Sequence, residues 1–261
     1  MKVQVHSTSF HSEGEKIQGH FVTPKGAGPF PGICKYHGLP GSSDQVSGVA
    51  SQLAKAGFAV LTFNFRGFRT SEGLFSLAGE IKDASTAITH LLDCPFILDD
   101  WTGVYGPSYG GAIAILAAAR DPRIRAVSLR APVFDTLEFA QSPVFELGLN
   151  ELLHNAPQEM HGLTDSYKRK LILDRLLQES KVFNPMNEIA KIAPRPLFII
   201  TGDADQGIPV DGVQRLFSQA QEPKELVIIK GADHNLSTPR SYKLTIDAVV
   251  DWFKRQAFET T

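Results

Sequence analysis

A single serine stands among small residues in the stretch Gly106-Pro107-Ser108-Tyr109-Gly110, which matches the pattern G-x-S-x-G. An apolar, strand-like run precedes this stretch and an apolar, helix-like run follows it. In a strand–turn–helix context the backbone reverses sharply, and small neighbours let the serine hydroxyl project above a sheet. The pattern therefore indicates a nucleophilic serine, and its alternative interpretation is a glycine-rich turn without chemistry.

A serine hydroxyl needs a base, and the base needs an acid to orient it. Two later strand-like runs end in residues of these types, because Asp203 and Asp205 follow "FIITG" and His234 follows "VIIKGAD". The carboxyl ends of parallel strands meet at one edge of a sheet, where open α/β sheets bind their ligands. We therefore expect a serine, a histidine and an aspartate to meet at this edge and to carry out acyl transfer.

The elements that must position these residues alternate between strands and helices. The 261 residues are 43% apolar and 21% charged, which is enough apolar material for a sizeable core. Apolar patterning predicts strands over 2–10, 16–24, 30–38, 58–67, 101–106, 124–134, 195–205 and 224–234. It predicts helices over 42–57, 81–92, 110–120, 210–220 and 239–257. The first two strands form an antiparallel start, and the later alternation predicts a mostly parallel sheet with helices on both faces.

One long region interrupts this alternation. No strand is expected over 135–194, whereas 137–155 and 166–180 have the pattern of helices. The region is too long for a loop in a compact domain. We therefore expect a helical lid over the carboxyl edge of the sheet, with 1–134 and 195–261 as the two parts of the core.

The chain resembles α/β-hydrolases over nearly its whole length. The stretches that carry the resemblance are "HGLPG", "NFRGFRTSEG", "GPSYGG", "TGDADQGIP" and "GADH". The small helical insertion and the N-terminal strands are similar to those of feruloyl and cinnamoyl esterases and related carboxylesterases. Dienelactone hydrolases and the catalytic domains of oligopeptidases are more distant relatives. The resemblance implies an α/β-hydrolase fold with a small helical lid.

The resemblance also assigns catalytic roles. It implies that Ser108 is the nucleophile, His234 the base and Asp205 the acid, with Asp203 as a turn residue. Some members of the family carry the acid one strand earlier, which would be Asp135 here. That alternative stays open at this point.

Two backbone amides are the implied oxyanion donors, those of Leu39 and Tyr109. His37 is expected to shape the turn that carries Leu39. The family often has an aspartate two residues before its Arg-Gly pair, and this chain has Asn64 there. The departure concerns a supporting loop, in which Arg66 is expected to be structural.

The expected activity is hydrolysis of carboxylic esters with short, medium or aromatic acyl groups, without a cofactor. The same residues would also suit a peptidase or acylaminoacyl hydrolase or a thioesterase, and a catalytically silent binding protein is the non-enzyme alternative. Apolar residues of the lid and of the segment leading into it are expected either to form the lid's core or to line the substrate pocket: Phe134, Phe139, Phe145, Leu149, Leu152 and Met160.

Charge and composition exclude several other classes of protein. The formal net charge is -2, so there is no basic excess for a nucleic-acid partner. No apolar run approaches the ~18 residues of a membrane span. Cys34 and Cys94 are expected to be separate reduced thiols, and no metal site is expected. We expect a soluble cytoplasmic protein and leave a homodimer open.

Overall fold

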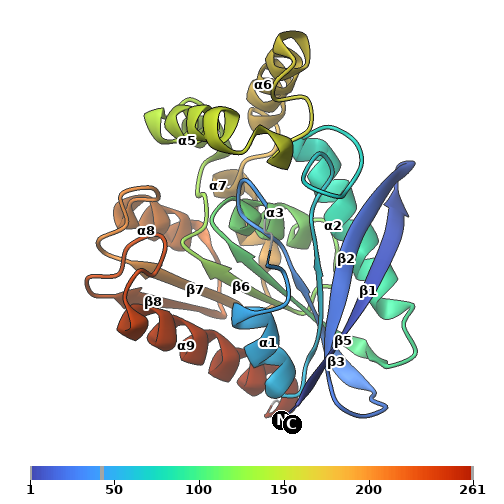
Figure 1. Ribbon diagram of the computed structural model, residues 1–261. Coiled ribbons are helices and arrows are strands. Elements are labelled where there is room, and N and C mark those ends of the chain that lie inside the picture. The colour runs from blue at the N-terminus through green and yellow to red at the C-terminus, as the bar shows by residue number, and fades with distance from the viewer. Residues whose placement is uncertain (1, 42–43, 260–261) are drawn as a thin grey trace.

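A single sheet forms the centre of the computed structural model, which describes residues 2–41 and 44–259 (Figure 1). Within these residues the sheet has eight strands in the order β1-β2-β4-β3-β5-β6-β7-β8. The strands are β1 (Val3–Ser12), β2 (Glu15–Pro24), β3 (Phe30–Lys35), β4 (Ala59–Phe63), β5 (Ile97–Pro107), β6 (Ala126–Arg130), β7 (Leu197–Gly202) and β8 (Lys224–Ile229). The β1–β2 and β2–β4 pairs are antiparallel and the other pairs are parallel, which confirms the predicted antiparallel start and mostly parallel sheet.

Helices cover both faces of the sheet, as the alternation predicted. The helices α1 (Gly48–Lys55) and α9 (Pro239–Phe258) pack against one face. The other face is covered by α2 (Leu77–Leu92), α3 (Tyr109–Ala118) and α8 (Val210–Gln219). All the residues of α3 are buried, because this helix is apolar on every side. The segment after Ser108 is therefore held firmly inside the core.

A helical lid lies above the carboxyl edge of the sheet (Figure 1). Its helices are α4 (Thr136–Ala140), α5 (Pro143–Asn155) and α6 (Ser166–Ser180), with a short 3-10 turn at η1 (Pro157–Glu159). The two elements that follow, α7 (Pro185–Glu188) and the 3-10 turn η2 (Ile189–Ile192), pack against α3 in the core. The prediction of a single helix over 137–155 is wrong, because the helix is interrupted between α4 and α5. Pro143 has no N–H to continue α4, and the Ser142 side chain accepts a hydrogen bond from the Phe145 amide to begin α5.

Side-chain hydrogen bonds and a backbone bridge are among the contacts that join the lid to the core. Glu179 of α6 accepts hydrogen bonds from the Ser76 hydroxyl and the Ala78 amide, which lie at the start of α2. Phe68 of the core and Met160 of the lid form an isolated antiparallel bridge. These contacts fix the far end of the lid above the sheet.

The loop after β4 is held by a buried ion pair. The Arg66 guanidinium donates to Asp83 at 2.7 Å, and the side chain of Asp83 is fully buried. The Arg66 amide donates to the same carboxylate at 3.0 Å. Glu13 also pairs with Arg66, at 3.2 Å, but is half-exposed. These contacts confirm the structural interpretation of Arg66.

Replacing Arg66 with methionine should destabilise the protein by about 3–5 kcal/mol, because Asp83 would remain buried without its charged partner. Urea unfolding of the variant and the wild type measures this difference. Lys170→Met is the matched control, because it removes an exposed ion pair with Asp174 and should change stability by less than about 1 kcal/mol. Equal losses in the two variants would contradict a structural role for the Arg66 pair.

Candidate active site

Ser108 occupies the sharp turn between the last residue of β5 and the first residue of α3. Its backbone has φ +53° and ψ -126°, a left-handed conformation that a residue with a side chain rarely adopts. The Ser108 amide donates to the carbonyl of Arg130 on β6 at 2.8 Å. Such strain costs roughly 1–3 kcal/mol and persists only where the surroundings enforce it.

The glycines around Ser108 make the turn possible. A Cβ at Gly106 would lie 2.2 Å from the carbonyl oxygen of Gly110. A Cβ at Gly110 would lie 2.4 Å from the carbonyl oxygen of His37. These distances confirm that side chains at either position would clash, as the sequence pattern indicated.

His234 and Asp205 lie within hydrogen-bonding reach of this serine. The His234 Nε2 atom is 3.1 Å from the Ser108 Oγ, and its Nδ1 atom is 2.7 Å from the Asp205 Oδ2. The other carboxylate oxygen of Asp205 accepts hydrogen bonds from the amides of Gly207 at 2.9 Å and Ile208 at 2.8 Å. A hydroxyl, an imidazole and an anchored carboxylate are thus connected by consecutive hydrogen bonds.

The other two aspartates that follow strands have different partners. Asp135 begins α4, where its Oδ1 accepts hydrogen bonds from the Leu137 and Glu138 amides, each at 2.9 Å. Asp203 accepts a hydrogen bond from the Gly231 amide and so acts as a turn residue. Of these candidates, Asp205 is the aspartate that the structure places against His234.

Arg130 touches both the serine turn and the histidine loop, and sequence reasoning missed it. Its carbonyl accepts the Ser108 amide, as described above, and its guanidinium donates to the backbone carbonyl of His234. The residue ends β6, which lies between β5 and β7 in the sheet. The available signal was its position as a charged residue at the carboxyl end of a strand beside the serine strand.

The two amides expected to stabilise an oxyanion border the serine. Tyr109 is the first residue of α3, so its N–H has no partner within the helix. The turn with Leu39 passes close by, because a Cβ at Gly38 would lie 3.1 Å from the Ser108 Cβ. Leu39 itself lines the cavity that contains Ser108.

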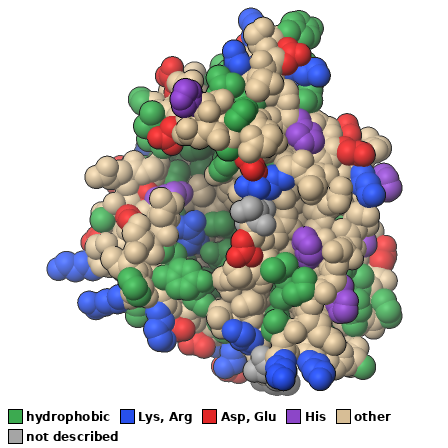
Figure 2. Space-filling model, in the orientation of Figure 1, with side chains coloured by type: hydrophobic (Ala, Val, Ile, Leu, Met, Phe, Trp, Pro, Cys, Tyr) green, Lys and Arg blue, Asp and Glu red, His purple; other side chains and the backbone are tan. Residues whose placement is uncertain are grey.

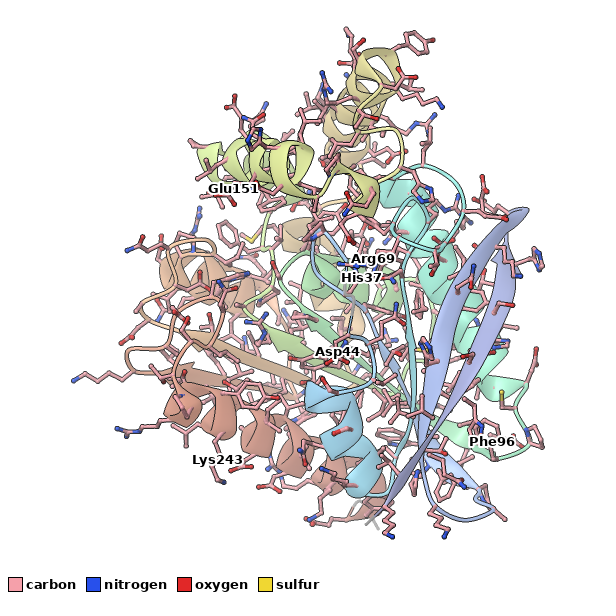
Figure 3. All side chains as sticks on the ribbon, viewed as in Figure 1. His37, Asp44, Arg69, Phe96, Glu151 and Lys243 are labelled. Atoms are coloured by element: carbon pink, nitrogen blue, oxygen red, sulfur yellow. The ribbon has the colours of Figure 1, made fainter. Side chains whose placement is uncertain are left out.

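His37 holds the Leu39 turn rather than meeting the serine. Its Nδ1 bonds the carbonyl of Gly38 at 2.8 Å, and its Nε2 accepts the Phe65 amide at 2.9 Å. Burial lowers the pKa of His37 from 6.5 to about 4, and the nearby cations Lys35 and Arg69 act in the same direction. Figure 3 shows His37 and Arg69 lying close together beneath the lid. The imidazole is therefore neutral at pH 7.

An apolar cavity of about 190 Å³ opens beside Ser108 and His234 beneath α5. Figure 2 shows a hollow with hydrophobic side chains below this part of the lid. Five of the six predicted pocket residues line the cavity: Phe139, Phe145, Leu149, Leu152 and Met160. The sixth, Phe134, does not line it, because its ring packs on Gly212 and beneath Arg215 at the wall of a neighbouring cavity.

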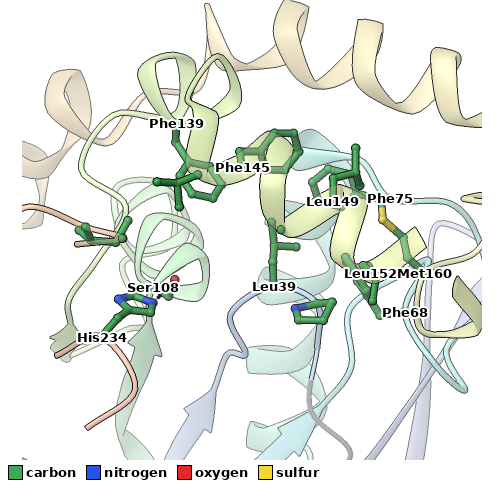
Figure 4. Close-up of a pocket in the computed structure, with 15 residues that line it drawn as sticks. Leu39, Phe68, Phe75, Ser108, Phe139, Phe145, Leu149, Leu152, Met160 and His234 are labelled. Carbon is green, nitrogen blue, oxygen red and sulfur yellow. Dashed lines mark hydrogen bonds between the residues drawn. The ribbon is translucent and has the colours of Figure 1, made fainter. Parts of the chain in front are cut away.

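Two aromatic wall residues come from outside the lid and were not predicted. Phe68 follows β4, and Phe75 precedes α2. The signal that could have identified Phe68 was its place in the loop that follows the carboxyl end of β4, whereas Phe75 lies at the far end of that loop. Figure 4 shows that Ser108 and His234 lie at one end of the cavity, with Phe68 and Met160 at the other.

Within residues 2–41 and 44–259, no group of three or more His, Cys, Asp or Glu side chains is arranged to hold a metal ion. Cys34 and Cys94 are both free thiols, as expected. In the same ranges, no helix has the length and hydropathy needed to cross a membrane.

Comparison with known proteins identifies the family. The sequence model of the prolyl oligopeptidase family matches residues 44–260. The chain belongs to the prolyl oligopeptidase family. Within the described residues, its Ser108, His234 and Asp205 have the arrangement of a serine hydrolase, and a serine hydrolase of this family is what the fold and comparisons support.

Several relatives share most of the length of this family member. The uncharacterized Escherichia coli K12 protein YfhR is 28% identical over 226 residues, which is 85% of this chain and 70% of YfhR. The polyketide transferase grgF of Penicillium sp is 23% identical over 218 residues, which is 71% of this chain and 74% of grgF.

Solved structures confirm the α/β-hydrolase fold. The hypothetical protein PA2218 from Pseudomonas aeruginosa has a TM-score of 0.76 at 20% identity, covering 98% of this chain and 94% of that one. Est1E from Butyrivibrio proteoclasticus with bound ferulic acid has a TM-score of 0.75 at 19% identity, covering 95% of this chain and 98% of that one. At these identities the similarity shows the fold.

The buried neutral His37 predicts a loss of stability in acid. The unfolded chain takes up a proton at this histidine below its ordinary pKa of 6.5, whereas the folded chain does so only near 4, so stability falls as the pH drops through this interval. The substitution His37→Gln removes the contribution of this histidine to the loss of stability in acid. The wild type should lose about 2 kcal/mol more than the variant between pH 8 and pH 5.

Urea unfolding at the two pH values measures this difference. His11→Gln is the control, because His11 is exposed on β1, and this variant should follow the wild type. A wild type and a His37→Gln variant that lose equal stability would show that His37 is not held neutral.

Proposed function

We propose that this protein is a carboxylic ester hydrolase that forms an acyl-enzyme on Ser108. The observation that carries the proposal is the hydrogen-bonded line from Ser108 through His234 to Asp205, which ends in an apolar cavity. In the first step His234 Nε2 takes the hydroxyl proton while the Ser108 Oγ attacks the ester carbonyl. His234 then gives this proton to the leaving alkoxide, and water releases the acyl group by the reverse route.

Asp205 orients His234 so that Nε2, the nitrogen that faces Ser108, acts as the base. Because Asp205 accepts from Nδ1–H, the neutral imidazole keeps Nε2 free to accept the serine proton. The Gly207 and Ile208 amides hold the carboxylate in place, so the imidazolium formed during reaction finds a fixed negative charge. Arg130 positions this group, since it binds the backbone on both the serine and histidine sides.

The Leu39 and Tyr109 amides are the proposed oxyanion donors. Donors that are fixed before the reaction stabilise developing charge without reorganisation, and loss of one typically costs about 100- to 1000-fold in rate. Tyr109 also lies at the N-terminus of α3, where the helix dipole favours negative charge. The proposed reaction uses no cofactor, and the apolar cavity suits a short, medium or aromatic acyl group.

Peptide or amide hydrolysis is the second candidate, because the chain belongs to the prolyl oligopeptidase family. The cavity argues for esters, since none of its described wall residues carries a formal charge that could bind a peptide terminus. Turnover of p-nitrophenyl butyrate and of an aminoacyl p-nitroanilide separates the two. Faster anilide than ester turnover would favour a peptidase.

Ser108→Ala should lower kcat for p-nitrophenyl butyrate by about 10⁴-fold or more, because the nucleophile is lost. Asp205→Asn should lower it by about 10³- to 10⁴-fold, because the asparagine favours the wrong imidazole tautomer. The matched control is Asp203→Asn, which changes a carboxylate two positions away that bonds Gly231. Steady-state rates with full activity in Asp205→Asn would rule out the proposed acid.

Arg130→Met should lower kcat by about 10- to 100-fold with little change in KM, because the histidine loop loses its support while the cavity stays intact. Arg130→Lys should restore part of the rate. Arg125→Met is the control, since Arg125 lies exposed at the opposite end of β6. A change in KM alone, or no change, would mean that Arg130 does not position His234.

A further inference from the structure

The cavity is more restrictive than ester hydrolysis alone requires. Among the described residues that line it, Ser108 and His234 have the only polar side chains, and both lie at the reactive end (Figure 4). The rest of the wall is aliphatic, aromatic or glycine. A substrate hydroxyl buried in this space would find no side-chain partner there, and an unpartnered buried hydroxyl is unfavourable.

The position of His234 determines which half of an ester enters this cavity. The leaving oxygen must lie within reach of His234 Nε2, and the oxyanion must face the Leu39 and Tyr109 amides. The remaining substituent of the carbonyl carbon, the acyl chain, then points away from His234. In Figure 4 the cavity extends from Ser108 past Leu39 in this direction, so its geometry fits the acyl group.

The far end of the cavity is closed by backbone that joins the lid to the core. Phe68 and Met160 form the isolated antiparallel bridge. The neighbouring Arg69 amide donates to the Glu159 carbonyl at 3.1 Å, and the two side chains form an ion pair at 2.5 Å. This wall therefore limits the length of the acyl chain.

The alcohol side of the serine has a different character. A second cavity, of about 140 Å³, shares four wall residues with the first: Phe139, Val144, Gly207 and Ile208. Its walls include the carboxylates of Asp135 and Glu138. A polar alcohol leaving toward this side meets hydrogen-bonding groups, whereas a polar acyl group on the other side does not.

We propose that the preferred substrates are esters of hydroxyl-free acyl groups, straight-chain or phenyl-ended, whose acyl part fills the apolar cavity. A cavity of about 150 Å³ holds benzene, so this one holds roughly six to eight carbons beyond the carbonyl. Met160 and Leu152 set the length limit from the lid side. The proposal rests on the ester hydrolysis proposed above.

Two series of p-nitrophenyl esters test the proposal. From acetate to dodecanoate, kcat/KM should peak near octanoate and fall at least about tenfold at dodecanoate. In a matched pair, the 3-(4-hydroxyphenyl)propionate should be hydrolysed about tenfold less efficiently than the 3-phenylpropionate, because its hydroxyl is buried without a partner. Equal efficiency within this pair would overturn the exclusion of hydroxylated acyl groups.

Variants test the position of the acyl chain. Met160→Ala and Leu152→Ala should each move the optimum to chains roughly one to three carbons longer, because each removes side-chain volume from the closed end. Leu147→Ala is the control, since Leu147 is an exposed residue of α5, the helix that carries Leu152, and should leave the optimum in place. An optimum that stays fixed in both cavity variants would overturn the assignment.

A third series separates the two halves of the ester. With the octanoyl group fixed, kcat/KM should not depend on the length of the alcohol in the ethyl, octyl and glyceryl esters. A kcat/KM that falls as the alcohol becomes longer would place the alcohol in the apolar cavity and overturn the proposal. If Ser108→Ala abolishes turnover while the acyl assignment fails, only this inference falls. If Ser108→Ala retains the activity, the proposed function itself falls.

Discussion

The left-handed backbone of Ser108 is the constraint on which the proposed site depends. At φ +53° the serine turns its hydroxyl toward His234, and this conformation costs roughly 1–3 kcal/mol. The surroundings offset that cost: the Ser108 amide binds the Arg130 carbonyl, Gly106 and Gly110 allow the backbone to close, and α3 is buried on every side. A looser turn would leave the hydroxyl without a partner, because His234 approaches from a different strand.

Core and lid have separate roles in this arrangement. The sheet fixes Ser108, Asp205 and His234 through β5, β7 and β8, and Arg130 on the intervening β6 joins the backbones on both sides. In contrast, no residue of α5 is buried, although several line the cavity. The chemistry therefore depends on a tightly packed scaffold, whereas selection among acyl groups depends on a more lightly packed helix. Substitutions in α5 can change the cavity without disturbing the proposed catalytic residues.

Much of this architecture could be predicted from the sequence because its signals are local. Apolar periodicity gave the strands and helices, and strand-end residues gave Ser108, His234 and two candidate acids. The resemblance to α/β-hydrolases then favoured Asp205 over Asp203. The break between α4 and α5 depends on Pro143 and Ser142, local signals that were outweighed by the apolar pattern around them. Arg130 and Phe68 lie at or after strand ends, but their roles, like that of Phe75, come from contacts between segments far apart in the chain, which a local pattern does not predict.

The most direct test of the central claim is the mass of the intact chain after reaction with a fluorophosphonate, followed by peptide mapping. We expect one phosphonyl group per chain, attached to Ser108, with labelling abolished in Ser108→Ala and strongly slowed in His234→Ala. A chain that remains unlabelled, or that carries the group on another residue, would contradict an activated Ser108.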